Sequence, residues 1–178
     1  MERRSGAGGV ANVVDEKSHG FLQYTAIMSQ RDPIRVFVTH AFEESDDYVR
    51  VFEYLESARN FYYRNCGNVT LTDIGRSQDA VREELRRQIS TAEVVIALSS
   101  LYSQQPDLLV FELNYAKASD KPVVFLPLFG REQPKLKALD GLTDETVSWD
   151  ERGLVDAVKR QARHEETTRW DTIEFKLD

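Results

Sequence analysis

Short apolar runs and longer stretches with helical spacing alternate through the middle of the chain. The short runs are rich in β-branched residues, which is typical of parallel strands buried on both faces. The longer stretches carry apolar residues three and four positions apart, as in helices that bury one side. The predicted strands cover residues 34–39, 69–72, 94–98, 123–126 and 146–149.

Each predicted helix carries an apolar stripe along one side. The first helix covers residues 46–58 after the N-cap Ser45, and its stripe consists of Tyr48, Val49, Phe52 and Leu55. Residues 93–119 are expected to form a strand, a polar turn and a helix. Further helical segments are expected at 77–89, around 136–139 and at 151–165.

Strands that alternate with helices predict an α/β fold, a flavodoxin-like, doubly wound sheet of about five parallel strands flanked by helices. The strand order expected is 2-1-3-4-5. In that order a ligand crevice forms between the first and third strands, and the loops after Thr39 and Leu98 form its walls. Those loops contain the candidate binding residues His40, Ala41, Phe42, Ser99, Ser100 and Tyr102.

Glu112 is the one carboxylate amid apolar neighbours in the helix that follows the third strand. At 100° per residue, Leu109, Leu113 and Ala116 share a face and Glu112 falls at its border, so its carboxylate can look into the crevice. There it can hold ribose hydroxyls and stabilise the positive charge that develops when a glycosidic bond breaks. A solvated or ion-paired glutamate fits the same spacing.

The two ends of the chain differ from its centre. Residues 1–30 are rich in glycine, serine and charge without periodicity, so we expect a flexible N-terminal arm. The α/β domain is expected to cover residues 31–165. The tail, residues 166–178, alternates apolar and charged residues near its end, which predicts an added edge strand.

Composition narrows the class of protein. A length of 178 residues fits one domain. The net charge of −7 argues against nucleic acid or anionic lipid as partners. The single cysteine, Cys66, excludes an intrachain disulfide and fits a cytoplasmic setting. The apolar runs fall short of the roughly 18 residues that a membrane span needs, so no membrane is expected.

Several motifs of known chemistry are missing from the sequence. No G-x-G-x-x-G follows the first strand, and neither a Walker lysine loop nor H-E-x-x-H occurs. Ser99 and Ser100 lack the flanking glycines of a nucleophile elbow. Asp46 and Asp47 fit a first helical turn better than a metal cluster, and no metal is expected.

Three segments stand out together: RVFVTHAFEESDDYVRVFEYL, REELRRQISTAEVVIALSSLY and FELNYAKASDKPVVFL. They resemble the TIR-like domains of the bacterial Thoeris antiphage defence family, relatives of Toll/interleukin-1 receptor domains. The resemblance covers about residues 34–160. Thr39-His40 matches the family's motif at the end of the first strand, and Phe111-Glu112-Leu113 matches its aromatic-Glu-aliphatic helix motif.

The resemblance implies an enzyme that takes NAD as substrate and cleaves its nicotinamide-ribose bond. The product would be an ADP-ribose-derived, often cyclic, signal for a downstream effector in antiviral defence, and a homo-oligomer is also within the family's range. By carry-over, Glu112 is the catalytic carboxylate. The binding residues implied are Thr39, His40, Ala41, Phe42, Ser99, Ser100 and Tyr102. Arg76, which lies where the chain departs from the family's turn, is a further candidate.

Two departures from the family pattern keep alternatives open. Leu108 stands where relatives often have a tryptophan, and the turn at 73–76 ends in Arg76, either a phosphate clamp or a solvated arginine. His40 either touches pyrophosphate or caps its loop. The alternatives are a non-catalytic TIR-like module for self-association or adaptor function, and an enzyme similar to nucleoside deoxyribosyltransferases.

Overall fold

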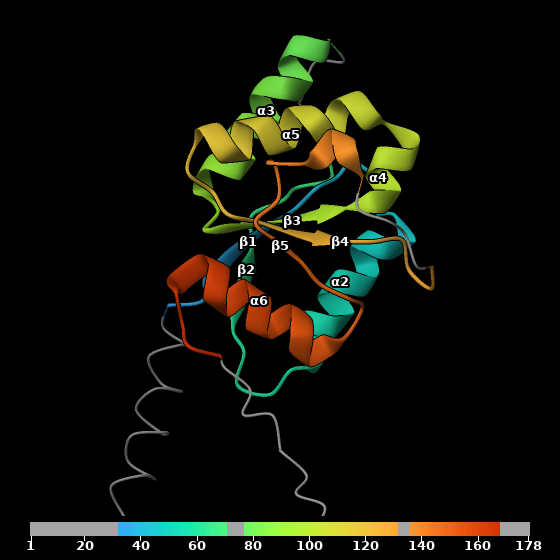
Figure 1. The fold of residues 1–178 in the computed structure, drawn as a ribbon. Coiled ribbons are helices and arrows are strands. Elements are labelled where there is room, and N and C mark those ends of the chain that lie inside the picture. Colours follow the sequence, from blue (N-terminus) through green and yellow to red (C-terminus); the bar gives the residue numbers. More distant parts are fainter. Residues whose placement is uncertain (1–31, 71–76, 132–135, 168–178) are drawn as a thin grey trace, which may run out of the picture.

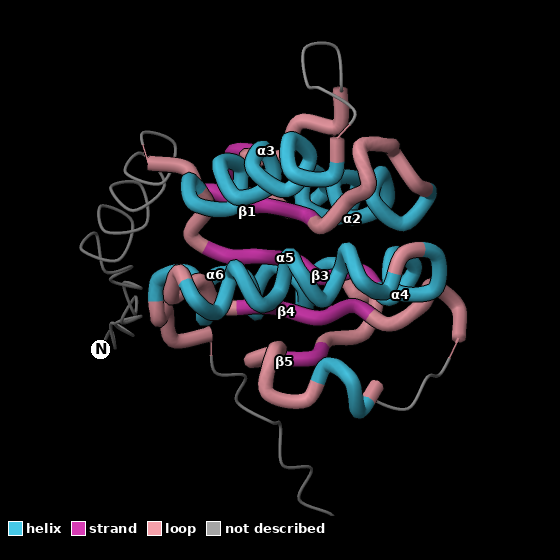
Figure 2. The backbone as a smooth tube through the Cα atoms, turned by 90° about the horizontal axis from the view of Figure 1, so that it is seen from above, coloured by secondary structure: helices cyan, strands magenta, loops and turns pink. Residues whose placement is uncertain are grey.

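A five-stranded, all-parallel sheet forms the centre of the protein, whose computed structural model describes residues 32–70, 77–131 and 136–167. The strand order is β2-β1-β3-β4-β5, which confirms the predicted fold class and order. The tube view in Figure 2 shows β1, β3, β4 and β5 side by side. The strands are β1 (Ile34–Val38), β2 (Tyr63–Asn65), β3 (Val94–Leu98), β4 (Val123–Leu126) and β5 (Glu145–Thr146).

Helices cover both faces of the sheet, as doubly wound folds require. Figure 1 shows α3 and α5 on one face and α2 and α6 on the other. Ser45, Ser77 and Asp150 each accept a hydrogen bond from a backbone N–H in the first turn of the helix that they cap. The helices are α2 (Asp46–Ser57), α3 (Gln78–Thr91), α4 (Ser99–Gln104), α5 (Pro106–Ala118), the 3-10 turn η1 (Lys137–Leu139) and α6 (Glu151–Arg163).

The strands bury both of their faces, which explains their continuous apolar runs. In β3, Val94, Ile96 and Leu98 pack into the core under α2 and α6. Val95 and Ala97 point to the opposite core, under α3 and α5. The carboxyl ends of β1 and β3 therefore lie between the two layers of helices. They are at the edge of the sheet where the loops that follow the parallel strands lie together.

Three predicted elements differ from the structure. The second strand is Tyr63–Asn65. Of the strand expected at 69–72, residues 69–70 are outside the sheet, because the backbone of Asn68 bonds to a side chain of α3, and residues 71–72 lie outside the described residues. The polar turn after β3 is the helix α4. The last strand spans only Glu145–Thr146 instead of 146–149.

The buried stripe of α2 also differs from the prediction. Val51 is fully buried, whereas Val49 is 41% exposed. At 100° per residue Val51 falls about 60° from Tyr48 and about 40° from Leu55 on the same side, whereas Val49 falls about 100° from Tyr48 on the other side, outside that face.

Some predictions fall outside the described residues. These are the N-terminal arm at 1–30 and nearly all of the edge strand expected at 166–178. Within the part of the chain that is described, no helix is long and apolar enough to span a bilayer.

Candidate functional site

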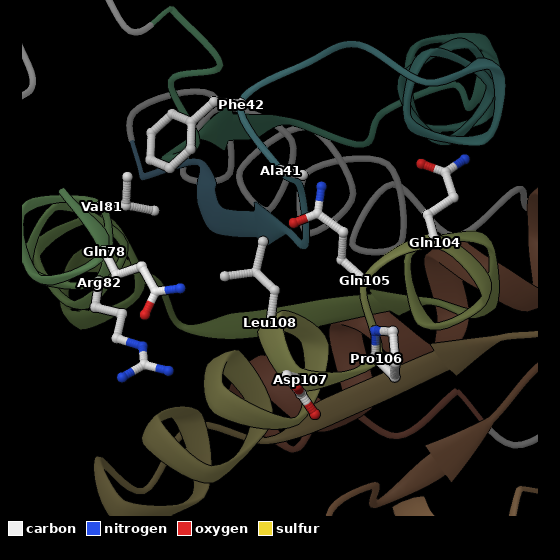
Figure 3. A pocket seen from close by; sticks show the side chains of 10 residues that line it. All are labelled: Ala41, Phe42, Gln78, Val81, Arg82, Gln104, Gln105, Pro106, Asp107 and Leu108. Atoms are coloured by element: carbon white, nitrogen blue, oxygen red, sulfur yellow. The ribbon is translucent and has the colours of Figure 1, made fainter. Parts of the chain in front are cut away.

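A cavity of about 510 Å³ lies beside the loop that follows β1. Figure 3 shows its walls: the loop after β1, the first turns of α3, and the junction of α4 and α5. Leu108 extends from the start of α5 toward the loop that carries Ala41 and Phe42. The strand order predicts a ligand site between the loops after β1 and β3. The lining residues are Ala41, Phe42, Gln78, Val81, Arg82, Gln104, Gln105, Pro106, Asp107 and Leu108.

Glu112 lies one helical turn after Leu108 and is fully buried, with 0% of its surface exposed. Its Oε1 accepts a hydrogen bond from the backbone N–H of His40 at 3.4 Å. Its Oε2 is also buried and has no hydrogen-bond partner among the described residues. Burial raises the pKa of the Glu112 carboxyl well above its usual value, and the bond from His40 opposes this only in part.

The position of Glu112 differs from the border position that helical spacing predicts. The side chain shares the buried face of Leu109, Leu113 and Ala116 and does not line the cavity. The reason is tertiary, because the end of β1 packs over this turn of α5 and brings the backbone of His40 onto the carboxyl group.

His40 is only 2% exposed, and each of its ring nitrogens has a protein partner. Nδ1 accepts a hydrogen bond from the backbone N–H of Phe42 at 3.1 Å. Nε2 therefore carries the proton and donates to Oε1 of Gln88 at 3.0 Å. Burial lowers the pKa of His40 to about 4, so the ring is neutral at pH 7. In this geometry His40 caps the loop, one of its two predicted roles.

Gln88 is a buried polar residue that the sequence analysis missed. Its Oε1 also accepts from the backbone N–H of Asn68 at 2.9 Å, and its Nε2 donates to the Asn68 carbonyl at 3.1 Å and to Oε1 of Glu84 at 2.9 Å. The amide thus ties α3 to the loop after β2 and to His40. One feature of the sequence indicates its burial: Gln88 lies three positions after Leu85, which places its amide on the buried stripe of α3.

Phe42 has a left-handed backbone, with a φ of 59°. For a residue with a bulky side chain this conformation costs roughly 1–2 kcal/mol. Two contacts with His40 hold it: the bond from the Phe42 N–H to Nδ1, and an edge-to-face ring contact at 5.0 Å between centroids. His40 therefore fixes a strained residue in the cavity wall.

The other predicted site residues divide into three groups. Thr39 is structural, because its Oγ1 accepts from the backbone N–H of Leu98 at 3.0 Å and so continues the sheet. Ser99, Ser100 and Tyr102 lie on α4 and do not line the cavity. Arg76 lies outside the described residues. Of the predicted residues that are described, the cavity brings together Ala41 and Phe42.

Five polar residues of the cavity wall were not predicted: Gln78, Arg82, Gln104, Gln105 and Asp107. The sequence gives little indication that these residues line a site. Arg82, for example, belongs to a run of charges that is typical of a solvated helix face. The described residues also contain no group of three His, Cys, Asp or Glu side chains placed to hold a metal ion.

The fold and the cavity define a doubly wound α/β protein with a ligand-sized site at the carboxyl edge of its sheet. No protein-family model matches the sequence, and no curated protein matches it. Among solved structures it is similar to the CMP N-glycosidase BcmB of Clostridium botulinum, with 16% sequence identity and a TM-score of 0.42. The match covers 70% of this chain and 98% of that chain. At this distance the similarity carries no argument about function.

Proposed function

We propose that this chain is a TIR-like enzyme that cleaves the nicotinamide-ribose bond of NAD. The observation that carries the proposal is the placement of Glu112, a fully buried acid with one unpartnered oxygen among the described residues, one turn from a wall of the 510 Å³ cavity. Cavities of about 300–1,000 Å³ are typical of small-molecule sites. The resemblance of the Phe111-Glu112-Leu113 segment to the family motif supplies NAD as the substrate.

The buried oxygen is costly for the fold. A buried polar group without a partner costs about 1–3 kcal/mol, and an apolar residue of similar shape avoids that cost. Such groups are concentrated at functional sites, where chemistry requires a perturbed carboxyl. Glu112 fits this pattern because its burial raises the pKa of the carboxyl group.

The proposed reaction uses the positive charge of the nicotinamide ring. When the C1′–N1 bond breaks, its electron pair goes to N1 and neutralises the ring, while positive charge develops on C1′ and the ring oxygen. Water, or a nucleophile of the same ADP-ribose unit, then attacks C1′ and loses its proton to solvent water. An ionised Glu112 beside C1′ stabilises that charge and holds the ribose hydroxyls.

The substrate itself promotes the ionisation of Glu112. In the free protein burial favours the neutral acid, whereas a pyridinium ring nearby favours the carboxylate. Contact requires a rearrangement of side chains, because Glu112 does not line the cavity. We propose Leu108, the lining residue one turn before Glu112 on α5, as the side chain that moves. The signalling role of the product and its effector complete the proposal and rest on the resemblance, and a cytoplasmic location rests on the single cysteine.

One observation favours a second candidate, a non-catalytic TIR-like binding module. Glu112 has 0% exposed surface and does not line the cavity. In such a module the carboxyl group would serve only as the acceptor for the His40 N–H.

Release of nicotinamide from NAD distinguishes the two candidates. The full chain is incubated with NAD, with and without extract from phage-infected bacteria, and nicotinamide is measured by chromatography. We expect release by the wild type and by Glu151→Gln, a control on the exposed first turn of α6. Glu112→Gln should lose about 100-fold or more. Absence of release by all three proteins under both conditions would refute the enzyme and leave the module, and equal release by all three would refute the role of Glu112.

A further inference from the structure

We infer that the cavity binds a nucleoside phosphate and that Arg82 is the residue that recognises its phosphate. Among the described residues that line the cavity, Arg82 is the one cation. It lies in the second turn of α3. This inference deepens the proposed function, on which it rests, by assigning the charged part of the substrate to a named side chain.

The three arginines of α3 differ in their partners. Arg86 pairs with Glu83 at 3.1 Å, and Nε of Arg87 donates to Glu84 at 2.8 Å. Arg82 forms no ion pair or side-chain hydrogen bond with any described residue, and its one recorded contact is with the ring of Phe111. Its guanidinium therefore keeps a full set of donors for an anionic ligand, in the planar arrangement that suits phosphate oxygens.

Phe111 holds Arg82 in place without using its donors. The guanidinium carbon of Arg82 lies 5.3 Å from the centroid of the Phe111 ring, within the range of a cation–π contact. Arg86 contacts the same ring at the same 5.3 Å, yet it does not line the cavity. The chain thus supplies a matched control, with the same residue type on the same helix and the same aromatic ring.

The rest of the cavity fits the uncharged part of a nucleotide. Phe42, Val81 and Leu108 offer apolar surface to a base or to a sugar face, and three glutamines offer donors and acceptors to hydroxyls and base edges. Asp107 is the one acid among the described lining residues. It lies in the first turn of α5, where it complements the positive end of that helix, and it does not pair with Arg82.

Binding measurements without turnover test the inference. AMP, adenosine and ribose 5-phosphate are titrated separately into the full chain and followed by calorimetry, using wild type, Arg82→Gln and Arg86→Gln. We expect wild type to bind AMP more tightly than either fragment. Arg82→Gln should weaken AMP about 10- to 100-fold and leave adenosine within about twofold, since a hydrogen bond to a charged group is lost. Arg86→Gln should match the wild type.

Each contrary result overturns the inference. These are no binding of AMP by the wild type, equal affinity for AMP and adenosine, equal affinity for AMP and ribose 5-phosphate, or equal effects of the two arginine substitutions. Failure here is distinct from failure of the proposed function. A chain that releases nicotinamide but lacks this discrimination keeps its activity and loses only the role of Arg82, whereas discrimination without release refutes the enzyme alone.

Discussion

The backbone N–H of His40 donates to Oε1 of Glu112 and so joins the end of β1 to the middle of α5. The ring of the same residue bonds to the backbone N–H of Phe42 and to the side chain of Gln88. One buried residue thus connects the cavity wall, α3 and the buried acid. A change in any of these three contacts should reach the other two.

The stability of the wild type should fall with rising pH relative to Glu112→Gln. The folded state holds the proton of Glu112 above the ordinary pKa of 4.5, because burial raises the pKa, while the unfolded chain loses it. Above pH 4.5 the folded state therefore binds more protons, and stability declines by up to about 1.4 kcal/mol per pH unit until the folded pKa is reached. Urea unfolding at pH 5 and pH 8 measures the difference, and a constant gap between the two proteins would contradict the buried acid.

Below pH 7, the titration of His40 should have the opposite effect on the stability of the folded state. Its pKa falls from 6.5 to about 4 in the folded state, so between those values the unfolded chain binds the proton first and stability is lost as the pH falls. His40→Asn lacks this loss, which is at most about 1.4 kcal/mol per pH unit. The asparagine oxygen can still accept from the N–H of Phe42. Both proteins keep Glu112 and the backbone N–H of residue 40 that bonds to it, so most of the contribution of Glu112 cancels when their urea unfolding at pH 7 and pH 5 is compared. Identical losses would show that His40 titrates normally.

Phe42→Gly should be more stable than Phe42→Ala, by about 1 kcal/mol. Both substitutions remove the ring that contacts His40. Glycine adopts the φ of 59° without strain, whereas alanine retains the steric penalty. Thermal and urea unfolding of the two variants test this order. If alanine is the more stable, the loop does not hold residue 42 in the left-handed conformation.

A comparison of Leu108→Ala with Leu109→Ala should distinguish the effect of access to Glu112 on activity from the effect of core packing on stability. Leu109 is fully buried, so its truncation should cost about 2–5 kcal/mol. Leu108 lines the cavity and should cost about 1 kcal/mol or less. Under the proposed function, Leu108→Ala also increases the rate of nicotinamide release by opening the way to Glu112. Unfolding curves and release rates are measured on both proteins, and a slower Leu108→Ala of unchanged stability would contradict its role as a barrier.

The fold could be predicted wherever a buried segment has one unambiguous period. The run Val94–Leu98 is apolar throughout and matches β3 at both ends. The face of α5 formed by Leu109, Leu113 and Ala116 is buried as predicted. The strand Tyr63–Asn65 was missed because it lies at the sheet edge, where its side chains are half-buried or exposed and carry no apolar pattern.

The site could be predicted only in outline. Strand order indicates the edge of the sheet where the cavity lies and the loop with Ala41 and Phe42. The depth of Glu112 depends on how the end of β1 packs on α5, across 72 positions of sequence, so helical spacing alone cannot reveal it. The hydrogen bond between Gln88 and Asn68 cannot be predicted from the sequence either, because a sequence does not distinguish a buried amide side chain from a solvated one.

The ionisation state of Glu112 in the presence of bound NAD tests the central claim most directly. Protein labelled with ¹³C at the glutamate carboxyl groups is titrated with an NAD analogue whose carbocyclic ribose prevents cleavage, and Glu112→Gln identifies the resonance. We predict that Glu112 in the free protein is protonated to a larger extent at pH 5 than an exposed glutamate, because burial raises its pKa, and that it shifts to the carboxylate on binding as the pyridinium ring approaches. A Glu112 resonance that stays unchanged at saturating analogue would contradict it.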